Sequence, residues 1–286
     1  MSGKIQNLIV RTITGVLFVA AIVTCFLKPT AMILLFALVT GLTIWEFTGL
    51  VNEIENVHTN RFICTAAGVY FFLAVAGFCT GFTPATAFIP YLLTVSYLII
   101  SELFLKAPNP IHNWAYTMLS QMYIALPFAT LNMLAFQSGN DGLASYNQLL
   151  PLSVFIFLWV NDTGAYCAGS LFGKHKLFPR VSPAKSWEGS IGGAVFVLIA
   201  AAIIGHIESA NMGDGALSIV VWMGLGLVVV VFGTLGDLVE SLMKRTLGIK
   251  DSGNILPGHG GMLDRFDSSL MAIPASVVYL YTLTLL

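Results

Sequence analysis

The feature that most constrains this sequence is a succession of nine long apolar stretches separated by short polar segments. They cover residues 11–28, 30–50, 62–81, 86–105, 114–136, 149–171, 189–207, 216–243 and 267–286. A helix needs about 20 apolar residues to cross the hydrocarbon core of a bilayer. Only 9% of the chain is charged, against roughly 25% in a soluble domain. The sequence therefore predicts an all-α polytopic integral membrane protein with about nine transmembrane helices.

The distribution of basic residues predicts which side of the membrane each loop occupies. With the N-terminus in the cytoplasm, every Lys and Arg except Lys28 falls in a cytoplasmic segment or at the cytoplasmic end of a span. Loops rich in Lys and Arg stay on the cytoplasmic side. We therefore predict a cytoplasmic N-terminus, and cytoplasmic loops at 172–188 and 244–266.

No repeat or Pro/Ser-rich linker divides the chain, so residues 1–286 are interpreted as one membrane domain. Helices in 1–148 would serve packing, lipid and dimer contacts. Polar motifs concentrate in 149–286, which is therefore the predicted catalytic half. The spacings Gly169–Gly173 and Gly189–Gly193 match GxxxG, a pattern of small residues that favours close helix packing.

Several carboxylates lie within or beside the apolar stretches, where each costs about 2.5–3.5 kcal/mol on insertion scales. Glu46 and Glu102 are close to predicted helix ends, which favours snorkelling or a structural hydrogen bond. Asp162 differs because "WVNDTGAY" groups several polar side chains inside an apolar run. We interpret Asp162 as part of a functional cavity.

The segment "GDLVESLMKR" places four polar residues on one helix face, because they are spaced at i, i+3, i+4 and i+7. These are Asp237, Glu240, Ser241 and Lys244. The alternative is a simple intrahelical Glu240–Lys244 pair on a solvated face. The apolar residues just before Asp237 argue against a solvated face.

The next cytoplasmic loop combines acids, glycines and basic residues. Asp264 and Asp267 are three apart, so one helical turn brings both carboxylates to one side. Oxygen ligands of this kind suit a hard cation such as Mg²⁺. The glycines of "PGHGG" expose backbone N–H groups that can bind an anion, and His259 is a better phosphate donor than metal ligand. Flanking Lys and Arg residues complete the pattern of a phosphate site, namely Lys244, Arg245, Lys250 and Arg265.

The other basic loop, "FGKHKLFPRVSPAKSWEGS", faces the same side. Ser182 followed by Pro183 predicts a helix start, with Ser at the N-cap and Pro at the first helical position. Lys185, Ser186 and Glu188 would then lie on the first turn, where a helix N-terminus attracts anions. The lysines before Pro179 are interpreted as attracting lipid headgroups instead.

The segment "SLMKRTLGIKDSGNILPGHGGMLDRFD" resembles the signature of the phosphatidate cytidylyltransferases, the CDP-diacylglycerol synthases. "NDTGAY" also fits the family's pattern. "SPAKSWEG" is similar to a second family motif, from which Ala184 and Ser186 depart. Ser186 keeps the hydroxyl, whereas Ala184 lacks a cation that the motif usually carries.

The resemblance implies an enzyme that transfers the cytidylyl group of CTP to phosphatidic acid, giving CDP-diacylglycerol and pyrophosphate. It implies Mg²⁺ as cofactor, leaves a second cation open, and implies a homodimer in the bacterial inner membrane with no nucleic-acid partner. Carried onto this chain, the expected metal ligands are Asp237, Glu240, Asp264 and Asp267. The expected catalytic residues are Ser241, Lys244, Arg245, Asp264 and Arg265. The expected substrate-binding residues are Asp162, Ser182, Lys185, Ser186, Glu188, Lys250, Asp251, Gly258, His259, Gly260 and Gly261.

Two other functions compete with this hypothesis. The intramembrane acids Glu46, Glu102 and Asp162 would also suit an ion- or proton-coupled transporter, although no inverted repeat is visible. A lipid kinase or another CDP-alcohol enzyme would share the metal and phosphate chemistry. A P-loop NTPase is excluded, because "GSLFGKHK" has Ala168 and His175 where the Walker motif needs Gly and Ser or Thr.

Overall fold

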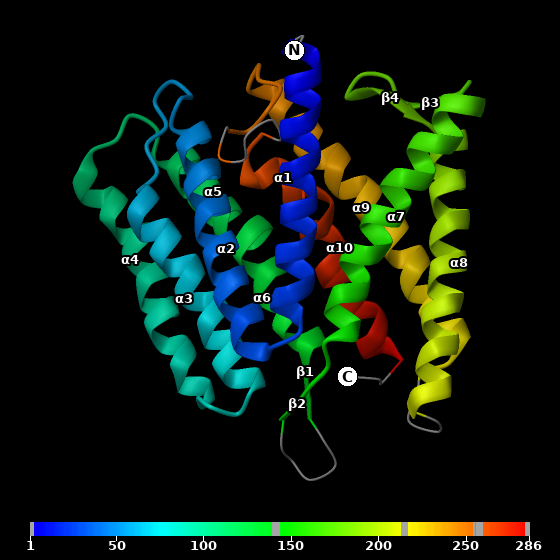
Figure 1. Cartoon of the computed structure of the whole chain (residues 1–286). Helices are drawn as coiled ribbons and strands as arrows, with labels where there is room; N and C mark the ends of the chain where they lie inside the picture. The colour runs from blue at the N-terminus through cyan, green and yellow to red at the C-terminus, as the bar shows by residue number, and fades with distance from the viewer. Residues whose placement is uncertain (1–2, 139–143, 213–216, 254, 256–259, 284–286) are drawn as a thin grey trace. The chain divides into compact units, whose positions relative to one another are not determined.

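The structure is a computed structural model that describes residues 3–138, 144–212, 217–253, 255 and 260–283 (Figure 1). The predicted sites at Gly258 and His259 lie outside the described residues. The chain forms two compact units. Unit 1 comprises Met1–Gln148 with Leu247–Phe266, and unit 2 comprises Leu149–Thr246 with Asp267–Leu286.

Unit 1 is built from helices connected by short turns. They are α1 (Gly3–Phe26), α2 (Pro29–Val51), α3 (Arg61–Cys79), the 3₁₀ turn η1 (Ala85–Phe88), α4 (Ile89–Leu105), α5 (Pro110–Leu119), the π-helical turn η2 (Ser120–Ala125) and α6 (Leu126–Ala135). A small antiparallel hairpin of β1 (Phe136–Ser138) and β2 (Ala144–Tyr146) follows. The π-helical turn lies where Pro127 lacks the N–H that a regular helix would use.

Unit 2 contains α7 (Leu149–Phe172), the strands β3 (Lys176–Phe178) and β4 (Ser182–Ser186), α8 (Trp187–Met212) and α9 (Ile219–Thr246). The helix α10 (Met262–Thr282) begins in unit 1 and belongs to unit 2 from Asp267 onward. The described residues thus place a helix in each of the nine predicted stretches, which confirms the all-α class. Seven of these helical segments are long and apolar enough to cross a membrane.

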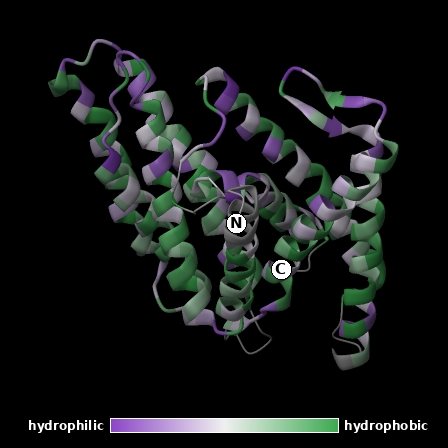
Figure 2. Ribbon diagram, turned by 45° about the horizontal axis from the view of Figure 1, so that its top comes forward, coloured by the Kyte–Doolittle hydropathy of each residue, from purple (hydrophilic) through white to green (hydrophobic). Residues whose placement is uncertain are grey.

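Exposed apolar side chains show how such helices suit a bilayer. Leu34 on α2, Leu103 on α4, Ile199 on α8 and Val220 on α9 are each more than half exposed. Figure 2 shows hydrophobic residues along most of the helical surface, with hydrophilic residues prominent in the β3–β4 hairpin. In water such exposure would be unfavourable, whereas acyl chains solvate it.

An aromatic cluster ties the segment 247–266 to the N-terminal helices of unit 1. The ring of Phe266 lies 5.5 Å from Phe18, 6.0 Å from Phe36 and 5.5 Å from Phe128, measured between centroids. Phe36, Phe128 and Phe266 are fully buried or nearly so. Burying a phenylalanine contributes roughly 1.5–3 kcal/mol. These contacts fix the start of α10 against α1, α2 and α6.

In unit 2, glycines let the C-terminal part of α7 pack closely against the N-terminal part of α8 (Figure 1). A Cβ atom at Gly192 would lie 2.2 Å from the Cβ of Ala168. A Cβ at Gly169 would lie 3.6 Å from the Cα of Gly189. The prediction that the GxxxG spacings mark close helix packing is confirmed for this pair.

The predicted helix start at Ser182–Pro183 is wrong. Ser182 begins strand β4, which pairs with β3 through Phe178↔Ser182 and Lys176↔Ser186. The helix α8 begins at Trp187, and Ser186 caps it by accepting a 3.1 Å hydrogen bond from the backbone N–H of Gly189. A serine N-cap is therefore present, but four residues later than predicted.

Candidate active site

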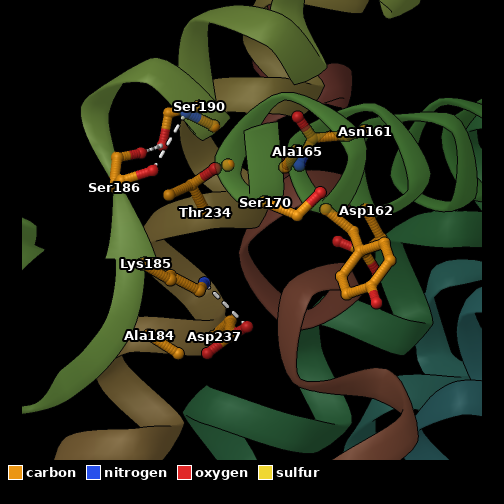
Figure 3. Close-up of a pocket in the computed structure, with 13 residues that line it drawn as sticks. Asn161, Asp162, Ala165, Ser170, Ala184, Lys185, Ser186, Ser190, Thr234 and Asp237 are labelled. Atoms are coloured by element: carbon orange, nitrogen blue, oxygen red, sulfur yellow. Dashed lines mark hydrogen bonds and ion pairs between the residues drawn. The ribbon is translucent and has the colours of Figure 1, made fainter. Parts of the chain in front are cut away.

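A polar cavity of about 450 Å³ lies within unit 2, between α7, β4, α8 and α9 (Figure 3). Asn161, Asp162 and Ser170 line it from α7, and Thr234 and Asp237 line it from α9. Ala184, Lys185, Ser186 and Ser190 line it from β4 and the start of α8. Three of the predicted substrate-binding residues therefore share one cavity with the predicted metal ligand Asp237.

The centre of this cavity is an ion pair between the β4 strand and helix α9. The Nζ of Lys185 lies 2.7 Å from Oδ2 of Asp237, and the two side chains are 27% and 30% exposed. The hydroxyl of Ser241, one turn along α9, donates a 3.2 Å hydrogen bond to Oδ1 of Asp237. Both carboxylate oxygens of Asp237 are thus held in place while the pair stays accessible (Figure 3).

Asp267 on α10 joins this group of charges. Asp237, Asp162 and Lys185 are all close enough to Asp267 to interact with it electrostatically. Gly236 makes the approach of α9 to α10 feasible, because a Cβ there would lie 2.7 Å from the backbone oxygen of Asp267. Asp267 therefore lies within electrostatic range of two other carboxyl groups and of one lysine.

Glu188, a predicted substrate-binding residue, holds the hairpin loop. Its carboxylate accepts a 3.1 Å hydrogen bond from the backbone N–H of Lys174, and Oε1 lies 2.6 Å from Nδ1 of His175. Trp187 also donates its backbone N–H to the carbonyl of His175 at 2.9 Å. These contacts close the β3–β4 hairpin onto the start of α8 and so orient Lys185.

Glu240 forms the predicted alternative pair, but not on a solvated face. Its Oε2 lies 2.7 Å from Nζ of Lys244, and the two side chains are 0% and 12% exposed. Glu240 is therefore neutralised inside unit 2 by its own helix neighbour. Arg245, the next residue, is exposed.

The part of the signature segment from Leu247 to Phe266 lies in unit 1, where Asp264 organises its own loop. Oδ2 of Asp264 accepts 2.8 Å hydrogen bonds from the backbone N–H groups of Ser252 and Gly261. Gly260 has φ = +84°, a conformation that favours glycine. Lys250, Asp251 and Arg265 are exposed.

Glu46 and Glu102 were predicted either to snorkel or to make a structural hydrogen bond. Both make hydrogen bonds within unit 1. Oε2 of Glu102 accepts a 3.0 Å bond from the side-chain amide of Asn113. Glu46 accepts bonds from the backbone N–H groups of Met262 at 2.9 Å and Leu263 at 3.0 Å. Two of the three acids that favoured a transporter, Glu46 and Glu102, therefore make hydrogen bonds within unit 1.

Comparison with known proteins gives the family. Residues 9–283 match the model of the cytidylyltransferase family. The chain belongs to this family. It is 32% identical over 275 residues to the phosphatidate cytidylyltransferase of Staphylococcus aureus (strain COL), covering 93% of this chain and 96% of the relative. It is 34% identical over 277 residues to the phosphatidate cytidylyltransferase of Haemophilus influenzae, covering 92% and 95%.

Membership of the cytidylyltransferase family confirms the resemblance inferred from the signature segment. The match runs through both units, so it includes the cavity and the segment around Asp264. These two relatives are bacterial, and the seven candidate spans make the chain a multi-pass membrane protein.

The cavity's donor atoms fit a hard divalent cation in their chemistry. Asp162 and Asp237 line the cavity and Asp267 lies within electrostatic range of both, so the three supply the carboxylate oxygens that a hard divalent cation prefers. Among the described residues, no group of three or more His, Cys, Asp or Glu is already arranged as a metal site. The three carboxyl groups therefore lie near one another, but they do not form a complete set of metal ligands.

Sequence reasoning did not select every residue that lines the cavity. Asn161 is 7% exposed, and its side-chain oxygen has no hydrogen-bond partner. Ser170, Ser190 and Thr234 add hydroxyl groups. The sequence pattern "WVNDTGAY" had already grouped Asn161 with Asp162 as polar residues of a functional cavity, although only Asp162 was named as a site residue. The hydroxyl groups gave no such signal, because isolated Ser and Thr are common in membrane helices.

Proposed function

We propose that this chain transfers the cytidylyl group of CTP to phosphatidic acid at the cytoplasmic face of the membrane. An oxygen of the lipid phosphate forms a bond to the α-phosphorus of CTP while the bond to the β-phosphate bridging oxygen breaks. The products are CDP-diacylglycerol and pyrophosphate. The observation that carries the proposal is full-length family membership, with an accessible Lys185–Asp237 pair in a polar cavity between apolar helices.

The chemistry sets a clear task for the protein. The lipid phosphate is already an anionic nucleophile, so the reaction needs little general-base catalysis. The main barrier is repulsion between that phosphate and the triphosphate of CTP. Positioning and charge stabilisation are the usual solutions in transfers at phosphorus. Lys185 would bind phosphate oxygens in the cavity, and its ion pair with Asp237 would hold its ammonium group in position.

The proposed ligands for Mg²⁺ are Asp237, Asp264 and Asp267, with Glu240 a weaker candidate because Lys244 already neutralises it. When bound, Mg²⁺ would neutralise phosphate oxygens of the two substrates. Ser241 would keep Asp237 oriented through its hydrogen bond.

The remaining predicted residues are proposed to contact CTP and the departing pyrophosphate. Lys244, Arg245 and Arg265 would stabilise charge that develops on the leaving group. Lys250, Asp251 and Gly258–Gly261 would bind the nucleotide, together with Ser182, Ser186 and Glu188 around the second loop. Acyl chains would stay among the apolar helices while the headgroup meets soluble CTP. The active form is proposed to be a homodimer.

The proposal is tested by supplying purified protein with Mg²⁺ and paired substrates. Labelled CTP is compared with labelled ATP, and phosphatidic acid with diacylglycerol. We expect label in the lipid fraction only with CTP and phosphatidic acid. Label transferred from ATP to diacylglycerol would indicate a lipid kinase instead, and no labelled lipid from folded protein would refute the proposal.

A further inference from the structure

A buried carboxylate in unit 1 contacts the segment that carries Asp264. Glu46 lies on α2 and is 8% exposed, yet three donors converge on it. The backbone N–H groups of Met262 and Leu263, the first residues of α10, lie 2.9 and 3.0 Å from its oxygens. The hydroxyl of Ser252 donates the third bond, to Oε1. A negative charge at the N-terminus of a helix is stabilising, so Glu46 acts as an N-terminal cap supplied by another helix.

Ser252 connects Glu46 to Asp264. Its hydroxyl donates to Glu46 and also accepts a 3.3 Å bond from the backbone N–H of Asp264. Its own N–H donates to Oδ2 of Asp264 at 2.8 Å. Ser252 is 3% exposed. A displacement of the Glu46 carboxylate would therefore reach the backbone and the side chain of Asp264 through a single residue.

Two glycines of the signature segment, Gly253 and Gly261, leave room for the carboxylate of Glu46 because they have no side chain. A Cβ atom at Gly261 would lie 2.0 Å from Oε1 of Glu46, and a Cβ at Gly253 would lie 2.6 Å from Oε2. Any side chain at these positions would collide with the carboxylate. Close approach to a protein carboxylate thus explains these two glycines without reference to a phosphate.

We propose that Glu46 is a positioning residue for the cytidylyl transfer and acts through Ser252 on Asp264. This rests on the proposed function, in which Asp264 takes part in the reaction. Glu46 contacts no substrate in this account. It fixes the start of α10 and the Ser252 turn, so that the Asp264 carboxylate is presented in one orientation.

The test compares Glu46→Gln with a matched control, Glu208→Gln. Glu208 is 6% exposed in unit 2 and accepts bonds from Trp222 Nε1 at 2.7 Å and from the Leu217 N–H at 3.1 Å. Both substitutions remove a buried carboxylate that accepts a backbone N–H bond, but only Glu46 is bonded to the Asp264 segment. Each full-length variant is purified, and kcat, KM for CTP, thermal stability and backbone amide exchange are measured.

We expect Glu46→Gln to lower kcat at least about tenfold, because the NH2 group of glutamine cannot accept the bond that one carboxylate oxygen of Glu46 accepted, so a buried donor loses its partner and Asp264 loses its orientation. KM for CTP should rise by less than kcat falls, because Asp264 is proposed to act in the reaction itself, whereas Gly261 is one of several proposed nucleotide contacts. Amide exchange should accelerate at Met262 and Leu263. In Glu208→Gln it should accelerate at Leu217, with kcat within about twofold of wild type.

A second variant separates positioning from stability. Ser252→Ala should also lower kcat. The double variant Glu46→Gln/Ser252→Ala should have a kcat within about twofold of that of Glu46→Gln alone, because both residues act on Asp264 through the same hydrogen bonds. Glu46→Gln with wild-type kcat, even if less stable, would overturn the positioning role. Wild-type protein without CTP-dependent product would overturn the proposed function itself, and the exchange data would still decide whether Glu46 holds the segment.

Discussion

Replacing Lys185 with alanine removes the only basic side chain among the residues described as lining the cavity. Its Nζ lies 2.7 Å from Asp237 Oδ2, and both side chains are about one-third exposed at 27% and 30%. Asp237 would then lose its ammonium partner, and Asp267 would lose the favourable charge interaction with Lys185 while it keeps the unfavourable ones with Asp237 and Asp162. A hydrogen bond to a charged group contributes about 1.5–3 kcal/mol, which corresponds to a loss of about 10- to 150-fold in kcat/KM.

The assay is the initial rate of CDP-diacylglycerol formation from labelled CTP at several CTP concentrations. The matched control is Lys176→Ala, because Lys176 is exposed on the same hairpin and is not among the cavity residues. Lys185→Arg should keep part of the activity, since it retains the charge with a different shape. Activity of Lys185→Ala within about twofold of the Lys176→Ala control would refute the role of the ion pair.

Further predictions concern packing and the metal. Gly192→Ala should lower the midpoint of thermal unfolding, at a cost of about 1–3 kcal/mol, because its Cβ would lie 2.2 Å from that of Ala168. Val195→Leu on the exposed face of α8 is the control, and equal midpoints for the two variants would contradict the packing. Chelation by EDTA should abolish product formation and added Mg²⁺ should restore it, while Asp267→Asn should raise the Mg²⁺ concentration needed for half-maximal rate. An unchanged Mg²⁺ requirement in Asp267→Asn would remove that residue from the proposed ligand set.

The helices could be predicted because their signal is local and repeated. An apolar run of about 20 residues has few alternatives to a membrane helix. The positions of the helices therefore follow from the positions of the apolar runs in the sequence. The two short hairpins were not predicted, since strands of three to five residues leave little periodicity. The cap at Ser186 was misplaced to Ser182 because the pairing of β4 with β3 overrides the local preference of Ser-Pro.

The long-range contacts could not be predicted from one sequence. Glu46 and Ser252 are separated by 206 positions, and nothing in either local pattern indicates the other. Asp237 and Asp267 lie on different helices, so their proximity depends on the close approach that Gly236 permits. The residue types indicated that the acids inside apolar stretches are functional. The packing of the helices determines which of them lie at or near the cavity, as Asp237 does, and which make structural hydrogen bonds, as Glu46 does.

The most direct test of the central claim measures both products of one reaction. Purified protein receives CTP, phosphatidic acid and Mg²⁺, and pyrophosphate and CDP-diacylglycerol are quantified together. The account predicts equal amounts of the two products, with none when CTP, the lipid or Mg²⁺ is omitted. Pyrophosphate release that continues without phosphatidic acid, or folded protein that makes neither product, would contradict it.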